Sequence, residues 1–419
     1  MAEIEPKTNR KAALRIAIFA FLVAGGLLVY QFLRNAGQDL TGTFGGGDTT
    51  GYIAAIQEHD DGGSQVVAIK PDGTLVPAEG HKAGNIDRDP AWPADGKFLY
   101  FISDRDKNES HLFRWDIDRG KVERKTLDKR TKTSAWCAPK TFENASATVL
   151  LISGGKVIEL DPRTSEGKQV LPPVSKEIGG GDEGSQSQFD QLYSKLGTSF
   201  REAKWGKDRA WIAAVLRQES GGEVLIVQDA AAAKPPTALV AGDRIEFDIS
   251  PATDSLIYTV VNFGFPDAEN VPPQFVKDGK IVKPFHHAFG VYSPSGGETG
   301  PIATSKDDHI VFLNPRYAPD GQTALMLVGD QSSGSLKVNS LVVIPANTAG
   351  SQNAARILDG DVSQASWGPD GSTIVYVKMD GGKRAVFTIQ KDGSGEKNWT
   401  GDKGDFSTPL ISPRTKTGS

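Results

Sequence analysis

The chain has 419 residues, which exceeds the usual size of a single hydrophobic core and indicates several domains or a repeat architecture. Its 38% hydrophobic and 24% charged residues are typical of a globular protein, and a net charge of −5 gives no reason to expect a nucleic-acid partner. The single cysteine, Cys137, excludes an intramolecular disulfide.

The first predicted element is a transmembrane anchor at residues 16–34, where an apolar run contains Gln31 as its only internal polar residue. A helix of this length crosses a hydrocarbon layer of about 30 Å. Residues 1–15 carry four cations, namely Lys7, Arg10, Lys11 and Arg15. This bias predicts a cytoplasmic N-terminus in the inner membrane, with the rest of the chain in the periplasm. A cleaved signal peptide is the alternative.

Residues 35–50 are small, polar and Gly-rich, and they predict a flexible tether. Residues 51–414 then repeat one phrase seven times: a large apolar residue, a Pro/Asp/Gly turn and a β-branched run. Successive copies are about 44–50 residues apart in four cases and about 69 in two, and four-stranded propeller blades repeat at about 40–50 residues. The large apolar residues are Trp92, Trp136, Trp205, Ile249, Tyr317, Trp367 and Ile411.

The two ends of this region complement each other. The last copy, residues 406–413, holds only the first strand of a blade, whereas residues 52–76 hold three strands and lack a first one. We therefore expect an all-β, seven-bladed propeller closed by pairing of the N- and C-terminal strands, followed by a tail at 415–419.

Two segments, SDRDKNESHLFRWDID at 103–118 and GPDGSTIVYVKMDGGKRAVFTIQKDGSGEKNWT at 368–400, resemble the TolB-like, WD40-like propeller repeat. The resemblance implies a propeller fold and says little about function. TolB has an N-terminal α/β domain for which this sequence has no room, so the chain is not expected to be TolB itself.

No pattern of catalytic residues is apparent, and we expect no enzyme activity, cofactor or metal. The histidines show no zinc-site spacing; they are His59, His81, His111, His286, His287 and His309. Some seven-bladed propellers with TolB-like repeats resemble oligogalacturonate lyases, which have histidines at the central channel. The seven first strands here have no histidine before their turns, which argues against that activity.

Two insertions are the better candidates for a binding site. Residues 176–197 include an amphipathic segment with Phe189 and Tyr193, predicted either to pack on its own blade or to face a partner. Residues 263–287 predict a hairpin around Asp278-Gly279. Its apolar residues are the predicted contacts with a partner: Phe263, Phe265, Phe275, Ile281 and Phe285.

The sequence thus favours a non-catalytic scaffold or accessory subunit that binds envelope or inner-membrane proteins. Two alternatives stay open: a polysaccharide-acting lyase or hydrolase with its site in the central channel, and a sensor of a small ligand or peptide.

Overall fold

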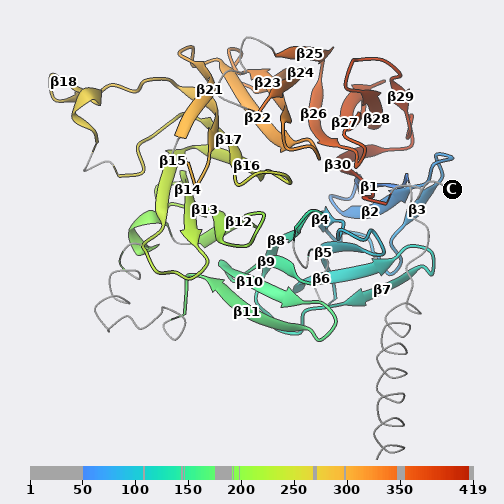
Figure 1. The fold of residues 1–419 in the computed structure, drawn as a ribbon. Coiled ribbons are helices and arrows are strands. Elements are labelled where there is room, and N and C mark those ends of the chain that lie inside the picture. Colours follow the sequence, from blue (N-terminus) through green and yellow to red (C-terminus); the bar gives the residue numbers. More distant parts are fainter. Residues whose placement is uncertain are drawn as a thin grey trace, which may run out of the picture. The chain divides into compact units, whose positions relative to one another are not determined.

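The computed structural model describes residues 51–106, 109–142, 145, 147–174, 191, 193–197, 199–267, 271–296, 299–346 and 354–414. Within these residues the chain forms seven four-stranded antiparallel sheets and one two-stranded hairpin. The sheets follow one another in chain order around a common centre (Figure 1). The predicted seven-bladed β-propeller is therefore confirmed.

Every blade has the same order of strands, from the centre outward. The first, innermost strands are β30 (Asp405–Ile411), β4 (Asp87–Ala91), β8 (Lys132–Cys137), β12 (Ser199–Trp205), β16 (Arg244–Ile249), β22 (Ile310–Tyr317) and β26 (Val362–Trp367). The second strands are β1 (Ile53–Glu58), β5 (Leu99–Asp106), β9 (Val149–Ser153), β13 (Trp211–Arg217), β17 (Leu256–Val261), β23 (Thr323–Asp330) and β27 (Thr373–Asp380).

The third strands are β2 (Ser64–Ile69), β6 (Glu109–Asp116), β10 (Lys156–Asp161), β14 (Glu223–Asp229), β20 (His287–Tyr292), β24 (Lys337–Pro345) and β28 (Lys383–Gln390). The outermost strands are β3 (Leu75–Pro77), β7 (Lys121–Arg124), β11 (Glu166–Leu171), β15 (Thr237–Gly242), β21 (Thr299–Ser305), β25 (Ala355–Asp359) and β29 (Lys397–Asn398). Between β17 and β20 lie η1 (Pro273–Phe275), β18 (Val276–Lys277) and β19 (Lys280–Ile281).

The middle strands of the blades are buried on both faces. In β13, for example, every residue from Trp211 to Leu216 is buried and only Arg217 is exposed. Each blade packs between two neighbours, so both of its faces are covered.

The core is divided among the interfaces between blades. The buried apolar residues of the described chain form seven clusters. Six of them are each shared by two consecutive blades, and the seventh, between the blades of β12–β15 and β16–β21, also includes Ala94, Phe142 and Ala145 from two other blades. One cluster, for example, joins Ile53 and Val67 of the closing blade to Val375 and Val386 of the blade before it. Each blade is thus stabilised mainly by its two neighbours.

The predicted closure of the ring is also confirmed. Strand β1 pairs antiparallel with β30, from Ile53 opposite Ile411 to Glu58 opposite Asp405. Phe406 of β30 is fully buried in the cluster beside β1. One blade is therefore built from both ends of the propeller, which leaves no open innermost edge.

The order of strands assigns each turn to a face of the propeller. Because neighbouring strands run antiparallel, turns between first and second strands lie on one face, and turns between second and third strands lie on the other. The chain enters at Gly51, just before the second strand β1, and so enters on the face of the first-to-second turns. The insertion between β17 and β20 lies on the opposite face.

No helix among the described residues is long and apolar enough to cross a membrane. The predicted anchor at 16–34 and the tether at 35–50 lie outside the described residues.

Candidate functional site

The insertion at 263–287 forms a projecting hairpin, as predicted. Val276 pairs with Ile281 and Lys277 pairs with Lys280. Between them, Asp278 and Gly279 have φ angles of 51° and 72°. Two consecutive positive φ angles define the type I′ turn, which an Asp-Gly pair favours.

Four phenylalanine rings connect this hairpin to the propeller. The ring centroids of Phe263 and Phe285 are 4.7 Å apart, and those of Phe263 and Phe265 are 5.1 Å apart. Phe265 in turn contacts Phe275 with a centroid distance of 5.3 Å. Phe263 and Phe285 also pack against the buried cluster between two blades. Four of the five predicted contact residues therefore support the insertion from within, because tilted and edge-to-face ring pairs stabilise one another.

The outer part of the hairpin carries exposed apolar side chains. Ile281 is 49% exposed, and Val276 and Val282 are 41% and 42% exposed. Three of the large exposed hydrophobic residues in the described chain thus lie within seven residues of one another. An exposed apolar group on a supported projection is typical of a protein-binding surface.

The other insertion is only partly described. Phe189 lies outside the described residues, and Gln191 and residues 193–196 are helical. Tyr193 is 5% exposed in the cluster between two blades, and its hydroxyl donates a hydrogen bond of 3.3 Å to Gln228 Oε1. The prediction that Tyr193 faces a partner is therefore corrected: its ring fills an interface between blades, and this leaves little of it for a partner.

A second candidate site is the central channel. A cavity of about 630 Å³ is lined by residues of all seven innermost strands. Trp92, Trp136 and Trp367 lie in its wall. The indole N–H of Trp92 donates to the carbonyl of Leu410, and that of Trp367 donates to the carbonyl of Arg316. Trp92 and Trp367 therefore join neighbouring blades.

Most charged groups of the channel are already paired. Lys204 Nζ lies 3.0 Å from Glu202 Oε1 and 3.2 Å from Asp248 Oδ1. Arg201 Nε lies 2.6 Å from Glu223 Oε1. Burial alone would raise the pKa of Glu202, but the positive charges of Lys204, Arg201 and Arg316 hold that pKa below its usual value. Glu202 is therefore a fixed carboxylate rather than a proton donor.

Two further carboxylates hold the backbone of the next blade. Glu246 Oε2 accepts the amide N–H of Asn314 at 2.5 Å. Asp248 Oδ2 accepts the amide N–H of Tyr317 at 3.0 Å. Both carboxylates lie on β16 and both amides on β22, so these bonds join neighbouring innermost strands.

Asp89, Arg316 and Lys140 are the exceptions in this cavity. Among the described residues, Asp89 has no hydrogen bond or ion pair through its carboxylate, and Arg316 bonds only the carbonyl of Pro315, at 2.9 Å. Burial raises the pKa of Asp89 to about 6, and the nearby charge of Glu202 adds to this while Arg88 and Arg201 oppose it. Among the described residues, the channel thus contains two cations, Arg316 and Lys140, and one titratable acid, Asp89, with no side-chain partner.

The sequence analysis did not single out these channel residues, because the innermost strands are bulged. Six of the seven change register against their second strand. The shifts include Asp89 in β4 and Arg201 in β12. Asp89 also has a positive φ of 50°. A bulge inserts one residue and re-aims its side chain, so strict alternation does not predict which residues face the channel. The sequence signal that could have pointed to these channel residues is a pair of adjacent charged residues shortly before the large apolar residue of a repeat, as in Arg201-Glu202.

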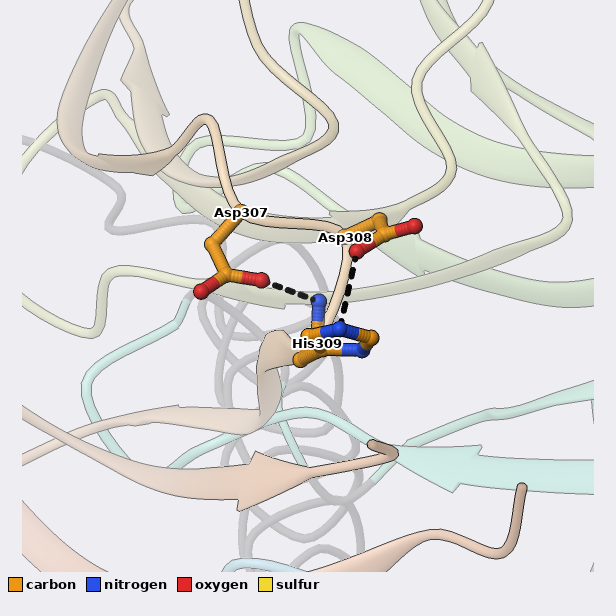
Figure 2. Close-up of side chains that lie close together, drawn as sticks. All are labelled: Asp307, Asp308 and His309. Carbon is orange, nitrogen blue, oxygen red and sulfur yellow. Dashed lines mark hydrogen bonds and ion pairs between the residues drawn. The ribbon is translucent and has the colours of Figure 1, made fainter. Parts of the chain in front are cut away.

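A third group is formed by Asp307, Asp308 and His309, between β21 and β22 (Figure 2). Among the described residues it is the one set of three possible metal ligands whose donor atoms lie within 4.8 Å of one another. All three are exposed and consecutive in sequence. Asp307 Oδ1 accepts the amide N–H of His309 at 2.9 Å, and Asp308 Oδ1 lies 3.4 Å from His309 Nε2. These contacts are those of a solvated turn.

The fold is similar to several solved structures, although no family model matches the chain. A puromycin-hydrolysing peptidase of Mycobacterium tuberculosis has a TM-score of 0.52 at 10% identity, over 83% of this chain and 52% of that one. An oligogalacturonate lyase in complex with manganese has a TM-score of 0.50 at 10% identity, over 83% and 85% of the two chains. TolB from Acinetobacter baumannii has a TM-score of 0.46 at 14% identity, over 88% and 68%.

A propeller domain of Cps50 (Swd1) from Myceliophteria thermophila is also among the similar structures, with a TM-score of 0.43 at 10% identity, over 80% of this chain and 89% of that one. At identities of 14% and below, the likeness concerns the fold alone. The chain is a seven-bladed β-propeller, and its function has to be argued from its own residues.

Proposed function

We propose that this protein is a non-catalytic binding propeller that contacts a protein partner through the hairpin of residues 263–287. The observation that carries the proposal is the exposed apolar end of the hairpin, Val276, Ile281 and Val282, on a base of stacked phenylalanines. A monomer gains nothing from exposing three adjacent branched apolar side chains, whereas a partner that covers them removes that area from water.

The predicted anchor extends this proposal to a location. A span at residues 16–34 would hold the propeller at the periplasmic side of the inner membrane, where its partner would be another envelope protein. The hairpin lies on the face opposite the entry of the chain at Gly51. The predicted tether would separate the propeller from the membrane anchor. The face with the hairpin could then bind a partner away from the point where the chain is attached to the membrane.

The proposal is tested by extracting the native, full-length protein in mild detergent and identifying what co-purifies by size analysis and mass spectrometry. We expect a stoichiometric protein partner. The double variant Val276→Asp, Ile281→Asp should weaken that association by at least about 30-fold, as expected for loss of an apolar hot spot. The matched control is Leu127→Asp, because Leu127 is 71% exposed outside the insertion. A protein that purifies alone, or an association insensitive to the double variant, would contradict the proposal.

A second candidate function is an enzyme acting on polysaccharide in the channel. It is favoured by one observation: the cavity of about 630 Å³ contains both Arg316 and Asp89, whose pKa of about 6 suits a general acid. Against it, glycoside hydrolysis uses two carboxyl groups, and Glu202, Glu246 and Asp248 are held in ion pairs or by backbone amides.

The enzyme candidate is tested on a panel of polysaccharides with and without divalent cations. Activity that disappears in Asp89→Asn and Arg316→Met would establish it. Inactivity across the panel, or activity unchanged in both variants, would discard it.

A further inference from the structure

Four buried polar atoms without a hydrogen-bond partner gather at one place beside the closing blade. They are Nε2 of His59, both ring nitrogens of His81 and Oδ1 of Asp87, judged among the described residues. The side chain of His81 is 10% exposed and that of Asp87 is fully buried. Buried polar atoms are normally satisfied, so a concentration of unsatisfied ones indicates a missing water or ion.

The two imidazoles and the carboxylate are neighbours in the folded chain. The ring centroids of His59 and His81 are 5.6 Å apart, and His81 Nδ1 lies 3.8 Å from Asp87 Oδ2. Two imidazoles on one tetrahedral zinc ion, with Zn–N distances near 2.1 Å, have centroids about 5–6 Å apart. We propose that His59, His81 and Asp87 form a Zn²⁺ site, which the spacing of the histidines in the sequence did not predict.

Asp87 is oriented as a metal ligand would be. Its Oδ2 accepts Arg105 Nη2 at 2.5 Å and the amide N–H of Val66 at 3.1 Å, which leaves Oδ1 free for an ion. Arg105 is itself held over the ring of Phe101, with 4.8 Å between its guanidinium carbon and the ring centroid. Partners that fix the second oxygen of a ligating carboxylate are a regular part of metal sites.

Asp61 provides the remaining negative charge. Its two carboxylate oxygens accept the amide N–H groups of Gly63 at 2.8 Å and Gly84 at 2.9 Å. These bonds hold the pKa of Asp61 below its usual value. Asp61 and Asp87 together offset two of the three positive charges that Arg105 and a divalent ion carry. The fourth position of a tetrahedral site is left for water or for Asp61.

Binding requires a small rearrangement. The three donor atoms are not all within 4.8 Å of one another, a condition that only Asp307, Asp308 and His309 meet among the described residues. His59 is half-buried in the turn between β1 and β2, so rotation about its side-chain bonds can bring Nε2 toward Asp87. The exposed group at 307–309 has no buried, unsatisfied donor and serves as the natural control.

The site would join two blades. His59 belongs to the closing blade, Asp87 is the first residue of β4 in the next blade, and His81 lies in the link between them. The isolated bridge from Ser64 to Ile86 already brings these blades together at this face. A bound ion would therefore stabilise the blade that closes the ring.

The test is isothermal titration of ZnCl₂ into the untagged, full-length, metal-stripped protein, with the melting temperature measured in parallel. We expect one Zn²⁺ per chain and a higher melting temperature on binding. His59→Ala and His81→Ala should each lower the affinity by more than roughly tenfold, whereas His309→Ala should not change it. Circular dichroism confirms that each variant is folded, and Co²⁺ in place of Zn²⁺ reports tetrahedral ligation by its visible absorption.

Absence of Zn²⁺ binding by the folded wild-type protein overturns the proposal. Binding that survives both His59→Ala and His81→Ala, or that is lost in His309→Ala, also overturns it, because the ion would then lie at the exposed turn.

Discussion

Phe406 provides the sharpest test of the closure of the ring. This side chain on β30 is fully buried in the cluster with Ile53, Val375 and Val386. Truncation of a buried phenylalanine to alanine removes its transfer free energy and leaves a cavity, at a total cost of about 3–5 kcal/mol. Phe406→Ala should therefore lower the free energy of unfolding by this amount.

The assay is equilibrium unfolding in urea, followed by fluorescence of the seven tryptophans. The matched control is Phe275→Ala on the projecting hairpin. Phe275 is half-buried and its one ring contact in the described chain is with Phe265, so its loss should cost about 1 kcal/mol or less.

Deletion of residues 405–419 is the stronger form of the same perturbation. It removes β30 and leaves β1 with an unpaired edge, so we expect aggregation that size-exclusion chromatography detects. If Phe406→Ala is as stable as Phe275→Ala, or if the truncated chain stays monomeric and folded, closure by the two ends does not hold the propeller together.

Two further predictions concern the channel. The pKa of Asp89 is raised to about 6 in the folded chain, so folding favours its protonated form and the wild type loses stability as the pH rises from about 4 to 6. Asp89→Asn should be up to about 3 kcal/mol more stable than wild type above pH 6 and equal to it below pH 4, as measured by urea unfolding across pH; a constant difference would refute this. Lys204→Met leaves the carboxylate of Glu202 without its nearest cation and should cost about 3 kcal/mol. Adding Glu202→Gln should recover at least about 1 kcal/mol in a double-mutant cycle, and strict additivity would contradict the pairing.

Much of the architecture could be predicted because short local sequence patterns define the repeat. The large apolar residue marks each blade, and Asp-Gly turns mark several of them, without any knowledge of tertiary contacts. The hairpin at Asp278-Gly279 followed the same logic, and its two positive φ angles confirm the turn. The closure could be predicted because the N-terminal end of the repeat region lacked a first strand and the C-terminal end supplied one.

The sites could not be predicted to the same extent, because they depend on contacts between distant residues. His59, His81 and Asp87 come from three different segments and meet only through blade packing. Tyr193 has the spacing of an exposed amphipathic face, yet Gln228 and Phe200 of the next blade enclose it. The spacing of hydrophobic residues predicts that a side chain packs against an apolar surface, but it does not predict which surface.

The way the chain enters the propeller has a mechanical consequence. Gly51 leads directly into β1, which is hydrogen-bonded to β2 on one side and to β30 on the other. A force applied at residue 51 pulls this strand along its own axis. Both ladders are then loaded in shear, with many hydrogen bonds resisting together, instead of being peeled apart one bond at a time. The ring is therefore arranged to carry tension at the point where the preceding chain meets it.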